Sequence, residues 1–229
     1  MKEGTVRIFR LLEPAEQLVA GADPGNGVSW AACPLISRKY KDVPLVYHSR
    51  VESPEFGEDL FNVGIYVLKK TGSFPLLAIE RNIGQATIFK VVELGWPTEK
   101  LYRQKTFDRI LQKEEERIGF VTSRANRRKM LDELALKVKR NELKIYDEKI
   151  VTEMLTFVIN ERTNEPRPES GTFSDLIMAL AIGNQMLKES WVQAVWAPQP
   201  KPQNDRFIPH RAEGFIVEHP GPPKDWRNA

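Results

Sequence analysis

LVAGADPGNG, residues 18–27, is an apolar run that ends in an acidic residue and a glycine-rich turn. The pattern predicts a buried strand with Asp23 at its tip. A carboxylate in that position is costly unless a cation or hydrogen bonds compensate its charge. The simpler explanation is that Asp23 forms the turn, because its side chain can accept hydrogen bonds from nearby backbone amides.

Two further acidic residues stand where predicted elements begin or end. Glu80 closes the apolar run 76–79, and Asp175 opens a helical pattern at 176–182. An acidic residue in the first turn of a helix also favours the helix dipole, so each residue alone has a structural explanation. Together they are the donors that hard cations such as Mg²⁺ take alongside water and phosphate oxygens. The three positions therefore suggest metal-assisted phosphodiester chemistry.

Length and composition describe an ordinary globular chain. Its 229 residues and 26.3 kDa suffice for one sizeable domain with its own core. No stretch approaches the ~18 apolar residues of a membrane span, and the N-terminus lacks the apolar region of a secretion signal. Cys33 is the only cysteine, which excludes an intramolecular disulfide and a cysteine-rich zinc site. We expect an intracellular protein with Cys33 packed in a strand.

Turn residues and apolar runs predict an antiparallel meander followed by alternating helix and strand. The predicted strands cover 6–10, 17–23, 28–37, 44–51 and 76–80. A helix capped by Ser53 runs to about Lys70 and is ended by Gly72. A second helix, 84–94, is expected on the far side of the sheet. This order predicts an α/β fold with a mixed central sheet.

The second half of the chain is more charged. We expect a projecting charged β-hairpin from 101–108 and 116–121, and then a helix capped by Thr122 or Ser123. The buried stripe of that helix is predicted to be Leu131, Leu134, Ala135 and Val138. A strand at 143–146, a helix at 149–159, a polar loop at 160–170 and the helix from Asp175 follow. The prolines after Ala197 exclude a helix there and predict a Pro-rich tail at 197–229, beyond a domain at 1–196.

Basic residues crowd into the segment 124–140: Arg124, Arg127, Arg128, Lys129, Lys137, Lys139 and Arg140. They form either a solvated helix face or a surface that meets phosphates and releases counterions on binding. The net charge of +3 does not decide between the two.

Six short stretches, in this order, resemble the C-terminal nuclease domain of the large terminase subunit of tailed double-stranded DNA bacteriophages. They are residues 22–25, 80–84, 119–123, 143–145, 153–158 and 174–181, and the resemblance spans Arg7 to Trp191. It implies a ribonuclease H-like fold and an endonuclease that cuts concatemeric viral DNA during genome packaging. Many relatives carry an acidic residue where Ser174 stands, so we predict that Ser174 caps a helix instead.

The resemblance also implies the site. Asp23, Glu80 and Asp175 would be the catalytic metal ligands for two divalent cations, Mg²⁺ or Mn²⁺. Asn82 and Gly84 match family positions for DNA contact, although Gly84 could simply start a helix. Arg124, Arg127 and Arg128 are the expected phosphate contacts. The implied partners are double-stranded DNA, a packaging ATPase domain, the small terminase subunit and the portal, in the host cell cytoplasm and without a membrane.

No G-x-x-x-x-G-K-[ST] motif for ATP binding occurs in the sequence, so we expect the chain to cut DNA without moving it.

Two alternative functions stay open. A Holliday-junction resolvase shares the fold class but acts on branched DNA. A non-catalytic DNA-binding domain would keep the fold and lack metal-dependent nicking.

Overall fold

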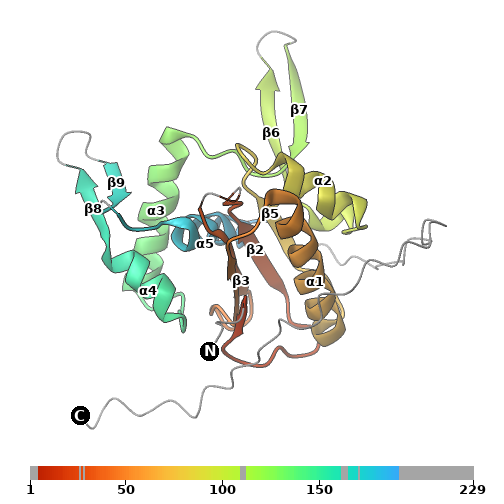
Figure 1. Cartoon of the computed structure of the whole chain (residues 1–229), viewed down its shortest axis with the longest axis horizontal. Helices are drawn as coiled ribbons and strands as arrows, with labels where there is room; N and C mark the ends of the chain where they lie inside the picture. The colour runs from red at the N-terminus through yellow and green to blue at the C-terminus, as the bar shows by residue number, and fades with distance from the viewer. Residues whose placement is uncertain are drawn as a thin grey trace.

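A five-stranded mixed sheet lies at the centre of the computed structural model, which describes residues 5–25, 27, 29–108, 112–160, 165–169 and 171–190 (Figure 1). Its strands are β1 (Val6–Ile8), β2 (Leu18–Ala22), β3 (Ala31–Ser37), β4 (Leu45–Ser49) and β5 (Leu76–Ile79), in the spatial order β1-β4-β3-β2-β5. The first four strands pair antiparallel, and β5 pairs parallel to β2. The carboxyl ends of β2 and β5 therefore meet at one edge of the sheet, and the predicted mixed α/β sheet is confirmed.

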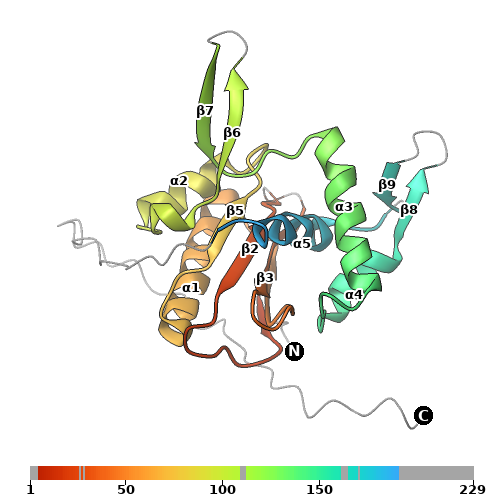
Figure 2. The same ribbon diagram turned by 180° about the vertical axis from the view of Figure 1, so that it is seen from behind.

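Helices cover both faces of this sheet (Figures 1 and 2). Their bounds are α1 (Ser53–Thr71), α2 (Gln85–Glu93), α3 (Arg124–Lys139), α4 (Glu148–Leu155) and α5 (Asp175–Met186), with a short 3₁₀ turn η1 (Thr98–Lys100). Along β2, Leu18, Ala20 and Ala22 pack into the core under α1 and α2, whereas Val19 faces the core of α3, α4 and α5. This alternation follows from the two-residue period of a strand with both faces covered.

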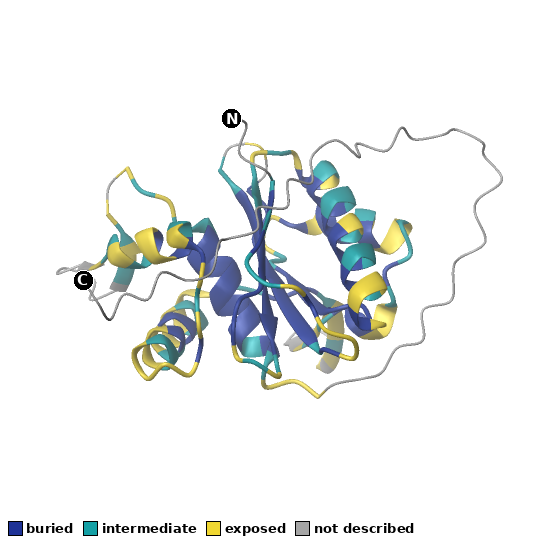
Figure 3. Ribbon diagram, turned by 90° about the horizontal axis from the view of Figure 1, so that it is seen from below, coloured by how far each residue is buried: buried dark blue, intermediate teal, exposed yellow. Residues whose placement is uncertain are grey.

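Helix α5 is the most deeply buried helix of the fold and lies directly on β2 and β3 (Figure 3). Nearly all of its residues are apolar or small, as expected for a helix surrounded by protein. Gly21 makes the contact possible, because a Cβ atom there would lie 2.1 Å from the carbonyl oxygen of Ala179 and 2.3 Å from the backbone nitrogen of Gly183. Gly183 faces the same contact from the helix side.

Two β-hairpins extend from the body. The first, β6 (Arg103–Asp108) with β7 (Lys113–Ile118), projects beyond the sheet and confirms the predicted charged hairpin (Figure 1). The second, β8 (Phe157–Asn160) with β9 (Glu165–Pro168), follows α4. The prediction of a helix over 149–159 is therefore wrong beyond Leu155, and the predicted loop at 160–170 contains a strand. The β-branched residues Val158 and Ile159 favour the hairpin.

Four other sequence predictions need correction. Residues 143–146 make one bridge, between Asp42 and Lys144, rather than a strand, although Leu143 is buried as its apolar character requires. Helix α2 packs against α1 on the same face of the sheet, not on the far side. The cap of α1 is Glu52 rather than Ser53, and the stripe of α3 buries Met130 while Ala135 is exposed.

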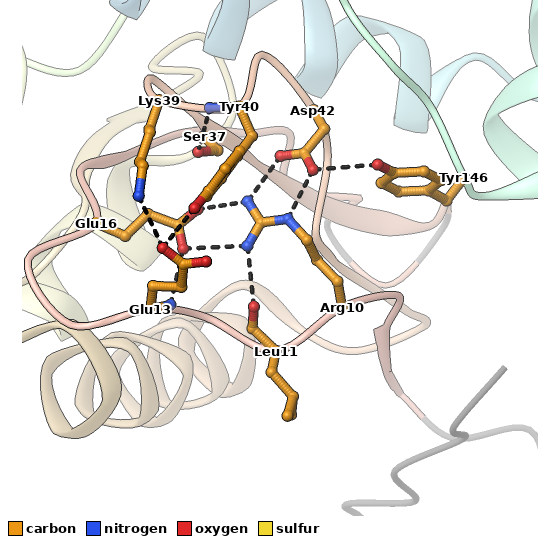
Figure 4. Close-up of polar contacts among 9 residues, drawn as sticks. All are labelled: Arg10, Leu11, Glu13, Glu16, Ser37, Lys39, Tyr40, Asp42 and Tyr146. Carbon is orange, nitrogen blue, oxygen red and sulfur yellow. Dashed lines mark hydrogen bonds and ion pairs between the residues drawn. The ribbon is translucent and has the colours of Figure 1, made fainter. Parts of the chain in front are cut away.

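Arg10 connects the segment before β2 to Asp42, in the loop between β3 and β4 (Figure 4). Its guanidinium donates to both carboxylate oxygens of Asp42, at 2.6 and 2.8 Å, and to both oxygens of Glu16, at 2.5 and 3.1 Å. The Tyr146 hydroxyl donates to the same Asp42 carboxylate at 3.2 Å. Asp42 and Glu16 are buried, so the network satisfies charges that would otherwise be costly.

The predicted Pro-rich tail, 197–229, lies outside the described residues. Within the described residues, no helix is long and apolar enough to cross a membrane. Cys33 is buried in β3, as predicted.

We expect Gly21→Ala to lower the free energy of unfolding by about 3 kcal/mol, because the new methyl group meets backbone atoms that cannot move aside. Gly72→Ala is the control: it also adds a methyl group, but in open space at a positive φ, and we expect a loss of about 1 kcal/mol. Urea unfolding measures both. Equal losses would contradict the close contact between β2 and α5.

Candidate metal and nucleic-acid site

Asp23 and Glu80 lie side by side because each directly follows one of two neighbouring parallel strands. The backbone N–H of Glu80 donates to the carbonyl of Ala22 at 2.8 Å, which extends the β2–β5 pairing by one residue. On the other side, Asp23 exchanges two backbone hydrogen bonds of 2.9 Å with Ala32. The backbone of both residues is therefore fixed by sheet hydrogen bonds.

Asp23 is only 8% exposed, and its surroundings oppose its charge. Burial raises the pKa of Asp23 well above its usual value, and the charge of Glu80, a hydrogen bond with Glu80 and the charge of Asp175 raise that pKa further. The guanidinium of Arg127 acts in the opposite direction. Glu80, Asp175 and Arg127, which come from separate parts of the sequence, thus interact electrostatically with Asp23.

Asp175 reaches this edge because α5 begins there. Its carboxylate accepts hydrogen bonds from the backbone of Trp30 and the side chain of Ser29; these lower its pKa, while burial, the larger effect, raises it. The Oδ2 atom of Asp175 is buried and has no hydrogen-bond partner among the described residues. Ser174 occupies the N-cap position, as predicted, but its side chain makes no capping hydrogen bond.

Helix α3 brings Arg127 to the carboxylates. Its start is fixed by a capping box: the N–H of Asn126 donates to Oγ of Ser123 at 3.3 Å, and the N–H of Ser123 donates to Oδ1 of Asn126 at 2.7 Å. One turn inside the helix, Arg127 is half-buried, and its Nε finds no hydrogen-bond partner in the described part of the chain. The guanidinium therefore has a donor available close to Asp23.

The remaining predicted DNA contacts lie around this group. Arg124 and Arg128 are exposed, and Arg128 makes a 3.7 Å ion pair with the exposed Asp132. The side chain of Asn82 donates to the carbonyl of Thr122 at 2.7 Å, which ties the turn after Glu80 to the start of α3. Gly84 is buried, and a Cβ there would lie 2.2 Å from the carbonyl oxygen of Glu80, so its visible role is packing. DNA contact by these residues stays a prediction.

Sequence reasoning missed Glu153, a buried acid beside Asp175. Its carboxylate accepts hydrogen bonds from the backbone N–H groups of Leu176 and, at 3.0 Å, Ile177, which have no partner within the helix because they lie in the first turn of α5. Burial raises the pKa of Glu153 to about 7, against the effect of those hydrogen bonds. The sequence signals were its place at the start of the matching stretch 153–158 and its position on the apolar side of α4, near Ile150.

The donor set suits a hard divalent cation. Asp23 is buried next to Glu80, the charge of the half-buried Asp175 acts on it, and Oδ2 of Asp175 lacks a hydrogen-bond partner among the described residues. Across the described ranges, no three His, Cys, Asp or Glu side chains already form a ready ligand group, so the carboxylates would have to turn toward an ion. A cation would offset both the burial and the neighbouring negative charges that raise the pKa of Asp23.

Comparisons with known proteins agree with this architecture. No family model and no curated protein matches the sequence. Solved structures do match: the large terminase nuclease from thermophilic phage G20c with bound magnesium has a TM-score of 0.58 and 14% identity, over 81% of this chain and 89% of that chain. The large terminase nuclease domain of Thermus phage P74-26 has a TM-score of 0.55 and 12% identity, over 85% and 92%.

The fold is that of a large terminase nuclease domain. The ribonuclease H-like prediction is therefore confirmed. The G20c nuclease has also been solved with bound cobalt, and that structure matches with a TM-score of 0.55 at 14% identity, over 81% of this chain and 89% of that chain. At these identities the likeness concerns the fold.

Without metal, we expect Asp23→Asn to stabilise the protein at neutral pH. The folded-state pKa of Asp23 is raised above the value of about 3.9 for an unfolded chain, so ionisation favours unfolding as pH rises above that value. The gain should be absent near pH 4 and grow toward neutrality, with about 2–4 °C in melting temperature for each kcal/mol.

Melting curves in EDTA at several pH values test this, with the exposed Asp132→Asn as the control. A melting temperature for Asp23→Asn that matches the wild type at every pH would contradict a raised pKa of Asp23 in the folded protein.

Proposed function

We propose that this chain is a metal-dependent DNA endonuclease that cuts concatemeric viral DNA during genome packaging. The observation that carries the proposal is the meeting of Asp23, Glu80 and Asp175 at one edge of the sheet, with Arg127 beside them. The fold supports it, because solved large terminase nucleases, including one with bound magnesium, have the same architecture.

In this proposal Asp23, Glu80 and Asp175 hold two divalent cations, Mg²⁺ or Mn²⁺. Such ions would activate a water molecule and stabilise the leaving 3′ oxygen in an in-line displacement at phosphorus. Asp23 must lose its proton to act as a ligand, so nicking rises with pH in the range where Asp23 ionises. The unpaired Nε of Arg127 is a donor for a non-bridging oxygen of the scissile phosphate.

Neighbouring residues fix the positions of the three acidic residues. Backbone pairing holds Asp23 and Glu80, and Ser29 and Trp30 hold Asp175. Arg124 and Arg128 lie on the exposed face of α3 and, in this proposal, would contact backbone phosphates of double-stranded DNA. The proposed setting is the host cytoplasm, with a packaging ATPase domain, the small terminase subunit and the portal as partners.

Two other functions are separated by substrate. A Holliday-junction resolvase of the same fold class would prefer four-way junctions to linear duplex. A non-catalytic DNA-binding domain would bind DNA and leave plasmid intact with any metal. The buried, mutually repelling carboxylates favour an enzyme, because a binding domain gains nothing from groups that destabilise it.

We expect Asp23→Ala, Glu80→Ala and Asp175→Ala each to abolish plasmid nicking in Mg²⁺ or Mn²⁺, while melting temperatures hold or rise. The wild type should nick supercoiled plasmid with metal and stop in EDTA. Glu93→Ala, at an exposed acid in α2, serves as the matched control and should nick normally. Near-normal nicking by any one of the three variants would remove that residue from the proposed ligand set.

We expect Arg124→Gln and Arg128→Gln to weaken binding of all duplexes alike and to reduce the salt dependence of binding by about one unit per lost phosphate contact. Arg127→Gln should in addition reduce nicking, since Arg127 faces the carboxylates. Arg140→Gln, at the opposite end of α3, is the control. Fluorescence anisotropy over a salt series measures the slopes, and slopes that match the wild type would favour a merely solvated helix face.

A further inference from the structure

A cluster of aromatic and basic side chains lies beside Asp175 on the same edge of the sheet. The rings of Trp30 and His48 stack with centroids 4.6 Å apart and planes 22° apart. The guanidinium of Arg50 lies 5.3 Å from the centre of the Trp30 ring, and Phe173 meets that ring edge-on at 6.4 Å. Trp30 is thus the centre of a platform formed with His48, Arg50 and Phe173.

Strand order explains why this platform adjoins the carboxylates. Trp30 directly precedes β3, and Arg50 directly follows β4, whose Ser49 pairs with Ala31. Because β3 is antiparallel to β2, both positions lie at the edge where β2 and β5 end. Arg50, Trp30, Asp23 and Glu80 therefore follow one another along the ends of β4, β3, β2 and β5.

The spacing suits a nucleic-acid strand. Arg50 stands two strands from Asp23, which is roughly 10 Å at the usual distance between strands. That places it within a few nucleotides of a phosphate bound at the carboxylates. Arg127 lies near the carboxylates on a different element, helix α3. The platform would therefore contact DNA separately from the basic residues of α3.

The chemistry of the exposed groups also suits a strand. Arg50 is exposed, makes no ion pair with a described carboxylate, and is oriented by the Trp30 ring, which leaves its N–H donors to a phosphate. Phe173 is 46% exposed although it borders a polar site. An exposed ring beside an oriented guanidinium is the pairing with which proteins hold a sugar-phosphate backbone and a base or sugar face.

We propose that Arg50 and Phe173, supported by Trp30, form a second contact for the DNA strand that is cut: Arg50 binds a backbone phosphate near the scissile one, and Phe173 packs on the adjoining sugar or base. This inference rests on the proposed nuclease function. The backbone of Trp30 also donates a hydrogen bond to Asp175, so the platform adjoins that carboxylate directly.

The test is DNA binding in EDTA, since Arg50 also acts on the charge of Asp175 and its loss would affect cleavage as well. We expect Arg50→Gln to weaken duplex binding about tenfold, the value of one charge-assisted hydrogen bond. Phe173→Ala should weaken it less. Arg140→Gln, an exposed arginine at the far end of α3, is the matched control and should bind like the wild type.

Duplexes in which single phosphates are replaced by neutral methylphosphonates locate the contact. Several replacements should weaken binding of the wild type, and at one of these positions, near the cleavage site, the replacement should have no further effect in Arg50→Gln. Wild-type affinity in Arg50→Gln and Phe173→Ala, or equal losses in wild type and Arg50→Gln at every position, would overturn the inference. A wild-type protein that binds but never nicks would contradict the proposed function and leave this binding test intact.

Discussion

The close contact between Gly21 of β2 and Gly183 of α5 is the constraint on which the rest of the structure depends. Without side chains at these two positions, the helix lies directly on the strand. The start of α5 then falls at the edge where β2 and β5 end, and Asp175 joins Asp23 and Glu80 there. Larger residues at either glycine would separate the helix from the sheet and disperse the carboxylates.

The site that results is destabilising in itself. Asp23 is buried beside two other acids, and its pKa is raised first by burial and then by the charges of Glu80 and Asp175. The surroundings offset this: Ser29 and Trp30 hydrogen-bond Asp175, Arg127 adds a positive charge, and Glu153 satisfies the backbone donors at the start of α5. In the proposed metal site, a cation at this edge of the sheet would replace repulsion among the carboxylates by attraction.

Local patterns predicted the features that depend on local chemistry. The apolar run before Asp23, the run before Glu80 and the helical period after Asp175 place all three acids at element ends, where the structure has them. The failures came where tertiary packing decides. Residues 143–146 look like a strand but find only one backbone bridge, and 157–160 continue a helical pattern yet pair with β9. The surroundings of Glu153, Trp30 and Arg50 could not be predicted, because they arise only where α4, β3 and β4 meet α5.

The most direct test of a metal site at this edge is a crystal structure of the protein soaked in Mn²⁺, with anomalous diffraction used to locate the ions. We expect anomalous peaks bounded by the carboxylates of Asp23, Glu80 and Asp175, and no such peaks in Asp23→Asn. Peaks elsewhere on the molecule, or none at this edge of the sheet at millimolar Mn²⁺, would contradict the claim that the contact between β2 and α5 assembles a metal site.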